Sequence, residues 1–307
     1  PAGQRPQRVT RRVFYPWPSA AVGGKLATIT PAPEYPAATP QQAENAKEHS
    51  MSTVNVNKRG QEFVDLHASG ELIVLPTVWD AWSARLAEAA GFKGLTIGSH
   101  PVATAFGVPD GEKQDLVEYM RQVERIAEAV NIPVSVDVEA GYGLSPDEIV
   151  GLAIESGAVG LNVEDTVHHD DDRVRGLREH ADYIEAMVQA AANLGVPFVV
   201  NGRTDAMVHG TALYEDPLAE TIARCQAMEE AGALSVYPVK LPDAASIKAV
   251  VDAVSVPVNA TAHPVNGTPA GGLAELKALG VRRVSFGPLW QLALEDTATQ
   301  QLQAWRG

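Results

Sequence analysis

The chain contains very little cysteine: Cys225 is the only one among 307 residues. A single cysteine excludes an internal disulfide framework and any zinc or iron–sulfur site built on several cysteines, and it is typical of proteins from a reducing compartment. The sequence also lacks any apolar run near the ~20 residues that span a bilayer, which excludes a membrane-spanning helix. We therefore expect a cytoplasmic protein with no membrane partner.

Positive charge is scarce as well. Lysine and arginine number 24 against 38 aspartates and glutamates, which gives a formal net charge of -14. A protein this acidic repels nucleic acid and anionic lipid, so neither is expected as a partner. Hydrophobic residues (45%) and charged residues (20%) have the proportions of an ordinary globular protein, with enough chain for one large domain or two small ones.

The first fifty residues have a different composition from the rest. They hold eight of the 21 prolines and a net charge of +3, while the remainder carries -17. Closely spaced prolines forbid a long helix, and no hydrophobic period is present. We predict an irregular N-terminal extension over residues 1–55 and a catalytic domain over residues 56–307. The extension is expected to be a leader, a tag or an over-extended start before Met51, or else an Arg-rich organelle address.

From Met51 onward, short β-rich runs alternate with amphipathic stretches. Their apolar character without alternation is typical of parallel strands that are buried on both faces. The predicted strands are Leu72–Pro76, Gly94–Gly98, Pro133–Asp137, Val159–Val163, Pro197–Asn201, Leu234–Tyr237, Val256–Asn259 and Arg283–Phe286. Eight β/α units in about 230 residues predict a closed (β/α)8 TIM-type barrel. An open doubly wound sheet is the alternative, but no Gly-x-Gly-x-x-Gly turn follows the first strand.

Turn chemistry supports these boundaries. Glycine is predicted to end the helix before five of the strands, at Gly91, Gly157, Gly195, Gly232 and Gly280. Capping residues followed by proline predict three helix starts, at Ser145-Pro146, Asp216-Pro217 and Thr268-Pro269.

Acidic residues follow two neighbouring predicted strands. Asp137 and Glu139 follow the third strand and Glu164 the fourth, so the barrel brings three carboxylates onto one rim. Such a cluster needs a compensating cation, and an all-oxygen set favours Mg²⁺, with Mn²⁺ as an alternative. Arg203, after the fifth strand, is placed to bind a substrate carboxylate or phosphonate. A metal-free network of ion pairs between these acids and Arg203 is the competing interpretation.

The order of these segments resembles the isocitrate lyase/phosphoenolpyruvate mutase superfamily, nearest its phosphonomutase-like branch. The resemblance covers residues 71–307. It is carried by six segments in the family's order: residues 76–86, Gly107-Val108-Pro109-Asp110, Asp137–Gly143, Gly160–Asp165, Gly202–Asp205, and a tail made of Pro257–Asn259 and Leu276–Gly287.

The resemblance implies a Mg²⁺ enzyme that makes or breaks a C–C or C–P bond in a small 2-oxo or enol carboxylate. Asp137 would be the direct metal ligand, with Glu139, Glu164 and Asp110 holding the metal through water. Arg203, Glu164, His168 and Asp110 would be the catalytic residues. The substrate-binding residues would be Gly98, Ser99, His100, Trp79, Asp80, Arg203 and Asn259.

The sequence departs from the family in the segment expected to form a lid. Isocitrate and methylisocitrate lyases carry a Lys-Lys-Cys-Gly-His loop whose cysteine acts as an acid, and no such loop is present here. Residues 166–176 instead contain His168 and His169 followed by three aspartates, and Cys225 is predicted to be a buried structural residue on a helix. A solvated lid without a catalytic histidine is the alternative for His168.

Two other functions stay open at this point: a barrel that binds a metabolite without turnover, and a metal-dependent pyruvate aldolase of another barrel family. The resemblance also implies a homo-oligomer, either a tetramer or a dimer.

Overall fold

The structure is a computed structural model that describes residues 53–306. The predicted extension lies outside these residues, apart from positions 53–55, where helix α2 (Thr53–Ala68) has already begun. In the described part of the chain, no helix combines the length and the apolar character needed to cross a membrane.

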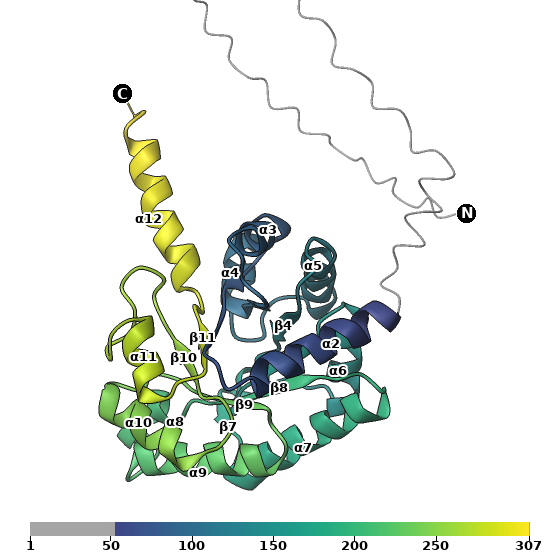
Figure 1. The fold of residues 1–307 in the computed structure, drawn as a ribbon, viewed down its shortest axis with the longest axis vertical. Helices are drawn as coiled ribbons and strands as arrows, with labels where there is room; N and C mark the ends of the chain where they lie inside the picture. The colour runs from purple at the N-terminus through teal and green to yellow at the C-terminus, as the bar shows by residue number, and fades with distance from the viewer. Residues whose placement is uncertain (1–52, 307) are drawn as a thin grey trace, which may run out of the picture. The chain divides into compact units, whose positions relative to one another are not determined.

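The strands form two parallel sheets at the centre of the fold, and helices lie around them (Figure 1). The larger sheet has the order β2 (Thr77–Val78), β3 (Leu95–Ile97), β4 (Val134–Asp137), β5 (Gly160–Val163), β8 (Val199–Thr204) and β9 (Ser235–Pro238). The smaller sheet has the order β1 (Ile73–Leu75), β11 (Arg283–Ser285) and β10 (Asn259–Thr261). Each predicted run contains part of a strand, although β10 begins only at the last residue of its predicted run.

The two sheets approach each other at two places. Pro76 separates β1 from β2, and because proline has no N–H to donate, its carbonyl alone continues the ladder by accepting from Thr96 N at 3.1 Å. On the other side, Val236 in β9 forms a parallel bridge with Val258, just before β10. The parallel α/β architecture is confirmed. A continuous ring of strand pairing is not seen among the described residues, so closure of the barrel stays a prediction.

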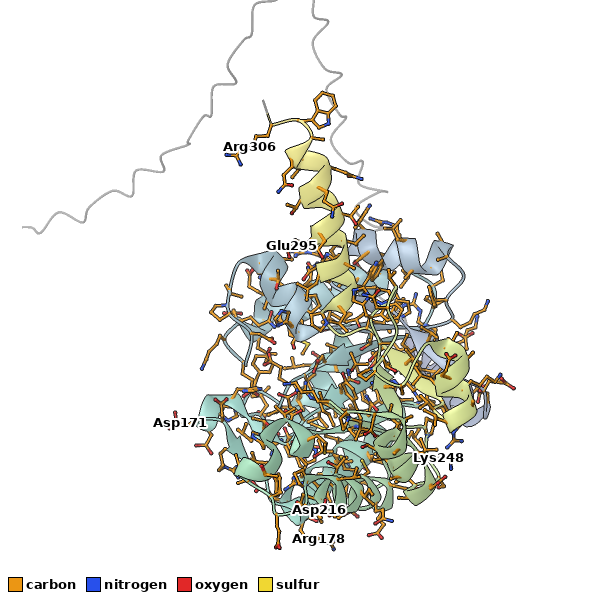
Figure 2. All side chains as sticks on the ribbon, turned by 90° about the vertical axis from the view of Figure 1, so that its left-hand side faces the viewer. Asp171, Arg178, Asp216, Lys248, Glu295 and Arg306 are labelled. Carbon is orange, nitrogen blue, oxygen red and sulfur yellow. The ribbon has the colours of Figure 1, made fainter. Side chains whose placement is uncertain are left out.

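Helices follow the strands throughout. They are α3 (Ala81–Ala89), α4 (Ser99–Phe106), α5 (Leu116–Glu128), α6 (Pro146–Glu155), α7 (Leu177–Asn193), α8 (Ala206–His209), α9 (Pro217–Glu230), α10 (Ala244–Ala253), α11 (Leu273–Leu279) and α12 (Leu289–Gln303). Between β5 and α7 the chain forms a small antiparallel hairpin, β6 (Thr166–Val167) and β7 (Arg173–Val174), around a 3-10 turn, η1 (His168–Asp170). A second 3-10 turn, η2 (Gly210–Ala212), follows α8. Figure 2 shows α12 extending from the rest of the domain, with Glu295 part-way along it and Arg306 near its end.

Most of the predicted helix boundaries are confirmed. Ser145 caps α6 reciprocally with Glu148, and Asp216 caps α9. The five predicted glycines all have positive φ, between 68° and 92°. The predicted start at Thr268 is wrong, because the Thr268 hydroxyl donates to the Gly271 carbonyl at 3.0 Å and closes a turn instead. Helix α11 begins at Leu273, after Gly271 has turned the backbone at φ 112°.

The imidazole of His67 is buried at the end of α2, and its Nδ1–H donates to the Phe63 carbonyl at 2.8 Å. Burial, with the nearby charge of Arg283, lowers the pKa of His67 to about 3 from an ordinary 6.5. Between these two values the unfolded chain binds the proton and the folded protein does not. His67 therefore makes the protein less stable as the pH falls through this interval.

We expect the stability advantage of the wild type over His67→Gln to shrink by about 2 kcal/mol between pH 8 and pH 5. The measurement is urea unfolding of both proteins at the two pH values, so that all other titrating groups cancel. A constant difference would show that His67 has the same pKa in the folded protein as in the unfolded chain.

Candidate active site

A cavity of about 590 Å³ opens at the carboxyl ends of the strands. Its inner wall is formed by strand residues, and the loops that follow the strands form its mouth. Five of the predicted substrate-binding residues line it: Gly98, Ser99, His100, Arg203 and Asn259. Of the predicted metal-side acids, Asp110 and Asp137 line it, whereas Glu139 and Glu164 do not. The first residues of α4 also lie here, and the N–H groups of Ser99 and His100 precede the first intrahelical hydrogen bond, which Val102 N donates to the Gly98 carbonyl.

Asp137 is the last residue of β4, and its carboxylate faces the cavity. One oxygen accepts from Glu139 N at 3.2 Å, while no donor among the described residues reaches the other. Burial raises the pKa of Asp137 to about 6, against the opposing charge of Arg203. Nearby positive charge therefore compensates the negative charge of this carboxylate only in part, and one of its oxygens is free to bind a ligand.

Glu139 is buried and does not line the cavity. Its two oxygens accept hydrogen bonds of 2.5 Å from the Tyr142 hydroxyl and from Glu112 N. Burial raises the pKa of Glu139 to about 7. Glu139 and Tyr142 both have left-handed backbones, with φ of 48° and 54°, so the loop after β4 is strained at the site.

Arg203 on β8 connects the other acids. Its Nε and Nη2 donate to the two oxygens of Asp205 at 2.9 and 3.1 Å, and its Nη1 forms an ion pair with Glu164. Burial raises the pKa of Glu164 to about 8, although the charge of Arg203 opposes this. Burial acts to raise the pKa of Asp205 also, but the Arg203 charge and its hydrogen bonds outweigh it and lower that pKa. The guanidinium is thereby fixed in one orientation at the cavity wall.

Three further buried charged residues, Asp165, Arg175 and Arg224, hold the ends of the strands that carry Glu164 and Arg203. Asp165 accepts from Thr204 Oγ1 at 2.7 Å and from Asp205 N at 2.9 Å, and it forms a 3.0 Å ion pair with Arg224 of α9. Arg175 donates to the carbonyls of Glu164 and Ala140. These contacts tie the ends of β5 and β8 together, so Glu164 and Arg203 stand on rigid backbone.

The β6–β7 hairpin, the segment predicted to form a lid, contacts the acids through His168. His168 Nε2 lies 2.6 Å from Glu164, and its Nδ1 lies 2.7 Å from Asp172. The hydrogen bond with Glu164 raises the pKa of His168 to about 10. His168 does not line the cavity. Its contacts with Glu164 and Asp172 hold the hairpin in place beside the acids. A catalytic role for His168 stays a prediction.

Trp79 and Asp80, two predicted substrate-binding residues, lie outside the cavity lining. Trp79 packs edge-on against Trp290 with ring centroids 5.2 Å apart, and Asp80 caps α3 by accepting from Ser83 N at 2.7 Å. These contacts do not favour a role in substrate binding. Cys225 is buried in α9, as predicted, and burial raises the pKa of its thiol well above its ordinary value.

Most of the described part of the chain matches one protein family. The family model for phosphoenolpyruvate phosphomutase matches residues 63–305. The chain belongs to this family. The resemblance seen in the sequence, to the isocitrate lyase/phosphoenolpyruvate mutase superfamily, is thereby confirmed.

Several relatives within this superfamily have been named or solved. The 2-methylisocitrate lyase of Escherichia coli is 31% identical over 208 residues, which cover 64% of this chain and 68% of the lyase. A Burkholderia cenocepacia structure provisionally called a phosphonomutase has 36% identity and a TM-score of 0.73, covering 80% of this chain and 100% of its own. Phosphonopyruvate hydrolase in complex with oxalate and Mg²⁺ has 26% identity and a TM-score of 0.68, covering 80% of this chain and 86% of its own.

The donor set of this family member fits a magnesium ion. Asp137, Glu139, Glu164, Asp205 and Asp110 outnumber the cations around the cavity. Within residues 53–306, His, Cys, Asp and Glu side chains do not converge in threes as a ready ligand group. Mg²⁺ does not need such a cage, since it usually takes one or two carboxylates and keeps several waters. Asp137, with its free oxygen facing the cavity, would be the direct ligand in that arrangement.

Sequence reasoning missed Glu112, which joins three parts of the site. Its backbone N–H reaches Glu139, and its carboxylate accepts from Tyr142 N at 2.6 Å and contacts His169 Nδ1 at 2.6 Å. Asp205 was also missed as a partner of Arg203, although it stands two residues away in the matched segment. Asp110, a predicted metal-side acid, lies 3.2 Å from His100 Nδ1.

Proposed function

We propose that this protein is a Mg²⁺-dependent enzyme that makes or breaks a C–C or C–P bond in a small 2-oxo carboxylate. One observation carries the proposal: Asp137, with an oxygen free, and Arg203, with its guanidinium fixed, face the same cavity. A binding site for the anionic end of a substrate therefore lies beside a site for a divalent cation. The names of the relatives support the same range of substrates.

Each residue has a defined task in this proposal. Asp137 would hold the ion directly, and Asp110, Glu139 and Glu164 would hold its waters. The bound ion supplies Lewis-acid stabilisation of the enolate charge that develops when the bond beside the carbonyl breaks. Arg203 orients the carboxylate or phosphoryl group, and the N–H groups at the start of α4 donate hydrogen bonds to the oxygens of the 2-oxo carboxylate.

The lid restricts the chemistry further. Methylisocitrate lyases use a lid cysteine as acid, whereas Cys225 lies buried in α9. The lid of this protein instead holds His168 against Glu164 and Asp172. A proton transfer on the lid would have to use a group other than a thiol, so substrates of the oxaloacetate and phosphonopyruvate type are favoured over 2-methylisocitrate.

The test is a panel of oxaloacetate, phosphonopyruvate and 2-methylisocitrate incubated with the protein and Mg²⁺ or Mn²⁺, followed by proton and phosphorus NMR. We expect one acid to be consumed, EDTA to stop the reaction and added Mg²⁺ to restore it. Binding of Mg²⁺ and oxalate without turnover of any acid would instead support a metabolite-binding barrel. Release of pyruvate from a 4-hydroxy-2-oxo acid alone would support an aldolase. Light scattering on the same samples tests the predicted homo-oligomer.

A further inference from the structure

Lys240 stands at the mouth of the cavity, in the loop that follows β9. Strand β9 pairs with β8 so that Tyr237 lies beside Arg203, and Val239 N donates to the Thr204 carbonyl at 3.2 Å. Strand β9 therefore lies directly beside the strand of Arg203, and Lys240 follows two residues after its end. The cavity therefore has a second cationic residue in its lining, in the loop next to Arg203.

The backbone of Lys240 is in the left-handed region, with φ of 62°. A side chain with a Cβ is disfavoured there, and lysine has no short polar group to relieve the cost as asparagine does. The other described non-glycine residues with positive φ lie in the loop of Glu112, in the loop after β4 and in the lid. Strained backbone in this domain is thus concentrated around the site, which is where functional strain is found.

The ammonium group of Lys240 has no hydrogen bond or ion pair within the described part of the chain. Some exposed lysines elsewhere do have such partners: Lys248 pairs with Asp252, and Lys277 with Glu71 at 2.9 Å. Lys93 and Lys113 also have none among the described residues, but they do not line the cavity. The contrast with Arg203 is also clear, because Glu164 and Asp205 already occupy its guanidinium. Lys240 is therefore a charge in the cavity lining that is available to a ligand.

We propose that Lys240 is a specificity-determining residue that binds a second anionic group on the substrate. The inference rests on the proposed function, in which Arg203 and the start of α4 hold the 2-oxo carboxylate end. The preferred substrates are then 2-oxo acids with a distal carboxylate at the far end of the carbon chain. Monocarboxylates such as pyruvate bind without using Lys240.

Calorimetric binding in the presence of Mg²⁺ tests this, with pyruvate compared to 2-oxoglutarate and 2-oxoadipate. We expect Lys240→Met, which keeps the length of the side chain and removes its charge, to weaken binding of at least one dianion by about five-fold or more. Pyruvate binding should stay within about two-fold, and Lys240→Arg should keep the preference. Lys248→Met is the matched control, since Lys248 lies on the outer surface of the domain (Figure 2).

Lys240→Gly separates function from folding. Glycine relieves the left-handed backbone, so this variant should melt at the same or a higher temperature while losing the preference for dianions. An equal effect of Lys240→Met on pyruvate and the dianions, or no effect on either, overturns the role of Lys240 alone. Failure of the wild type to bind any of the acids with Mg²⁺ overturns the proposed function and this inference together.

Discussion

Replacement of Asp137 by asparagine is expected to lower Mg²⁺-dependent turnover of the best substrate by at least about 10³-fold. The reason is that Asp137, at the end of β4, lines the cavity and has a carboxylate oxygen free of described donors. Asp110 also lines the cavity, but one of its oxygens contacts His100 Nδ1 at 3.2 Å. The oxygens of Glu139 are already held by Tyr142 and Glu112. A neutral amide at position 137 removes the charge that would hold the cation directly, and in the proposed arrangement Asp110 would hold only its waters.

Folding of this variant should not suffer. Burial raises the pKa of Asp137 to about 6. Without a bound cation, the charge of its ionised carboxylate therefore lowers the free energy of unfolding at neutral pH. Removing that charge should leave the metal-free protein as stable as the wild type or more so. A lower melting temperature would show that Asp137 is a structural ion-pair residue, as in the metal-free network considered above.

Three measurements make the result specific. Calorimetric titration with Mg²⁺ should show binding in the wild type and none in Asp137→Asn. Thermal unfolding in EDTA should give the expected order of stabilities. Asp296→Asn, an acid on the projecting helix α12, is the matched control and should keep both binding and turnover. Normal Mg²⁺ affinity in Asp137→Asn would contradict the assignment of the ligand.

The main elements of the fold, and the meeting of Asp137, Glu164 and Arg203, could be predicted because each depends on local pattern. Apolar runs define the strands, and parallel strands bring their carboxyl ends to one edge whatever the details of packing. Buried acids at those ends then need compensation. This reasoning uses residue type and position in the chain alone, so it holds without knowledge of any side-chain contact.

Glu112 shows what could not be predicted. It lies 27 residues before Glu139 and 57 before His169, in a loop with no periodic pattern, and only the folded arrangement brings the three together. The error at Thr268 has a different cause. A threonine before proline is a good helix cap in isolation, but its hydroxyl also closes a local turn, and the following glycines favour the turn.

The site of Lys240 was missed for a related reason. A lysine after a strand is usually an ordinary surface residue. Nothing in the sequence indicates that its backbone is left-handed or that it lacks an ion-pair partner. Both features depend on the register between β8 and β9. Specificity residues at a cavity mouth are therefore less predictable than the central acids, because they follow from loop geometry instead of strand order.

Arg203→Lys is expected to lower kcat/KM by about 10²- to 10³-fold, even though the positive charge is kept. The guanidinium contacts two carboxylates at once, through Nε and Nη2 to Asp205 and through Nη1 to Glu164. An ammonium group is a point charge and cannot hold both in this planar geometry. The lysine would pair with one acid, and the anionic end of the substrate would lose its fixed partner.

Arg203→Met should act on stability as well, because it leaves Asp205 buried without its ion-pair partner and Glu164 with His168 alone. Loss of one partner from a buried ion pair costs about 3–5 kcal/mol, which urea unfolding would detect. Arg178→Lys, on the exposed outer side of α7 (Figure 2), is the matched control and should change neither quantity. If Arg203→Lys kept wild-type kcat/KM while Arg203→Met lost only stability, Arg203 would be a structural counter-ion for the acids, and the substrate's anionic end would bind elsewhere in the cavity, with Lys240 as the remaining cation in its lining.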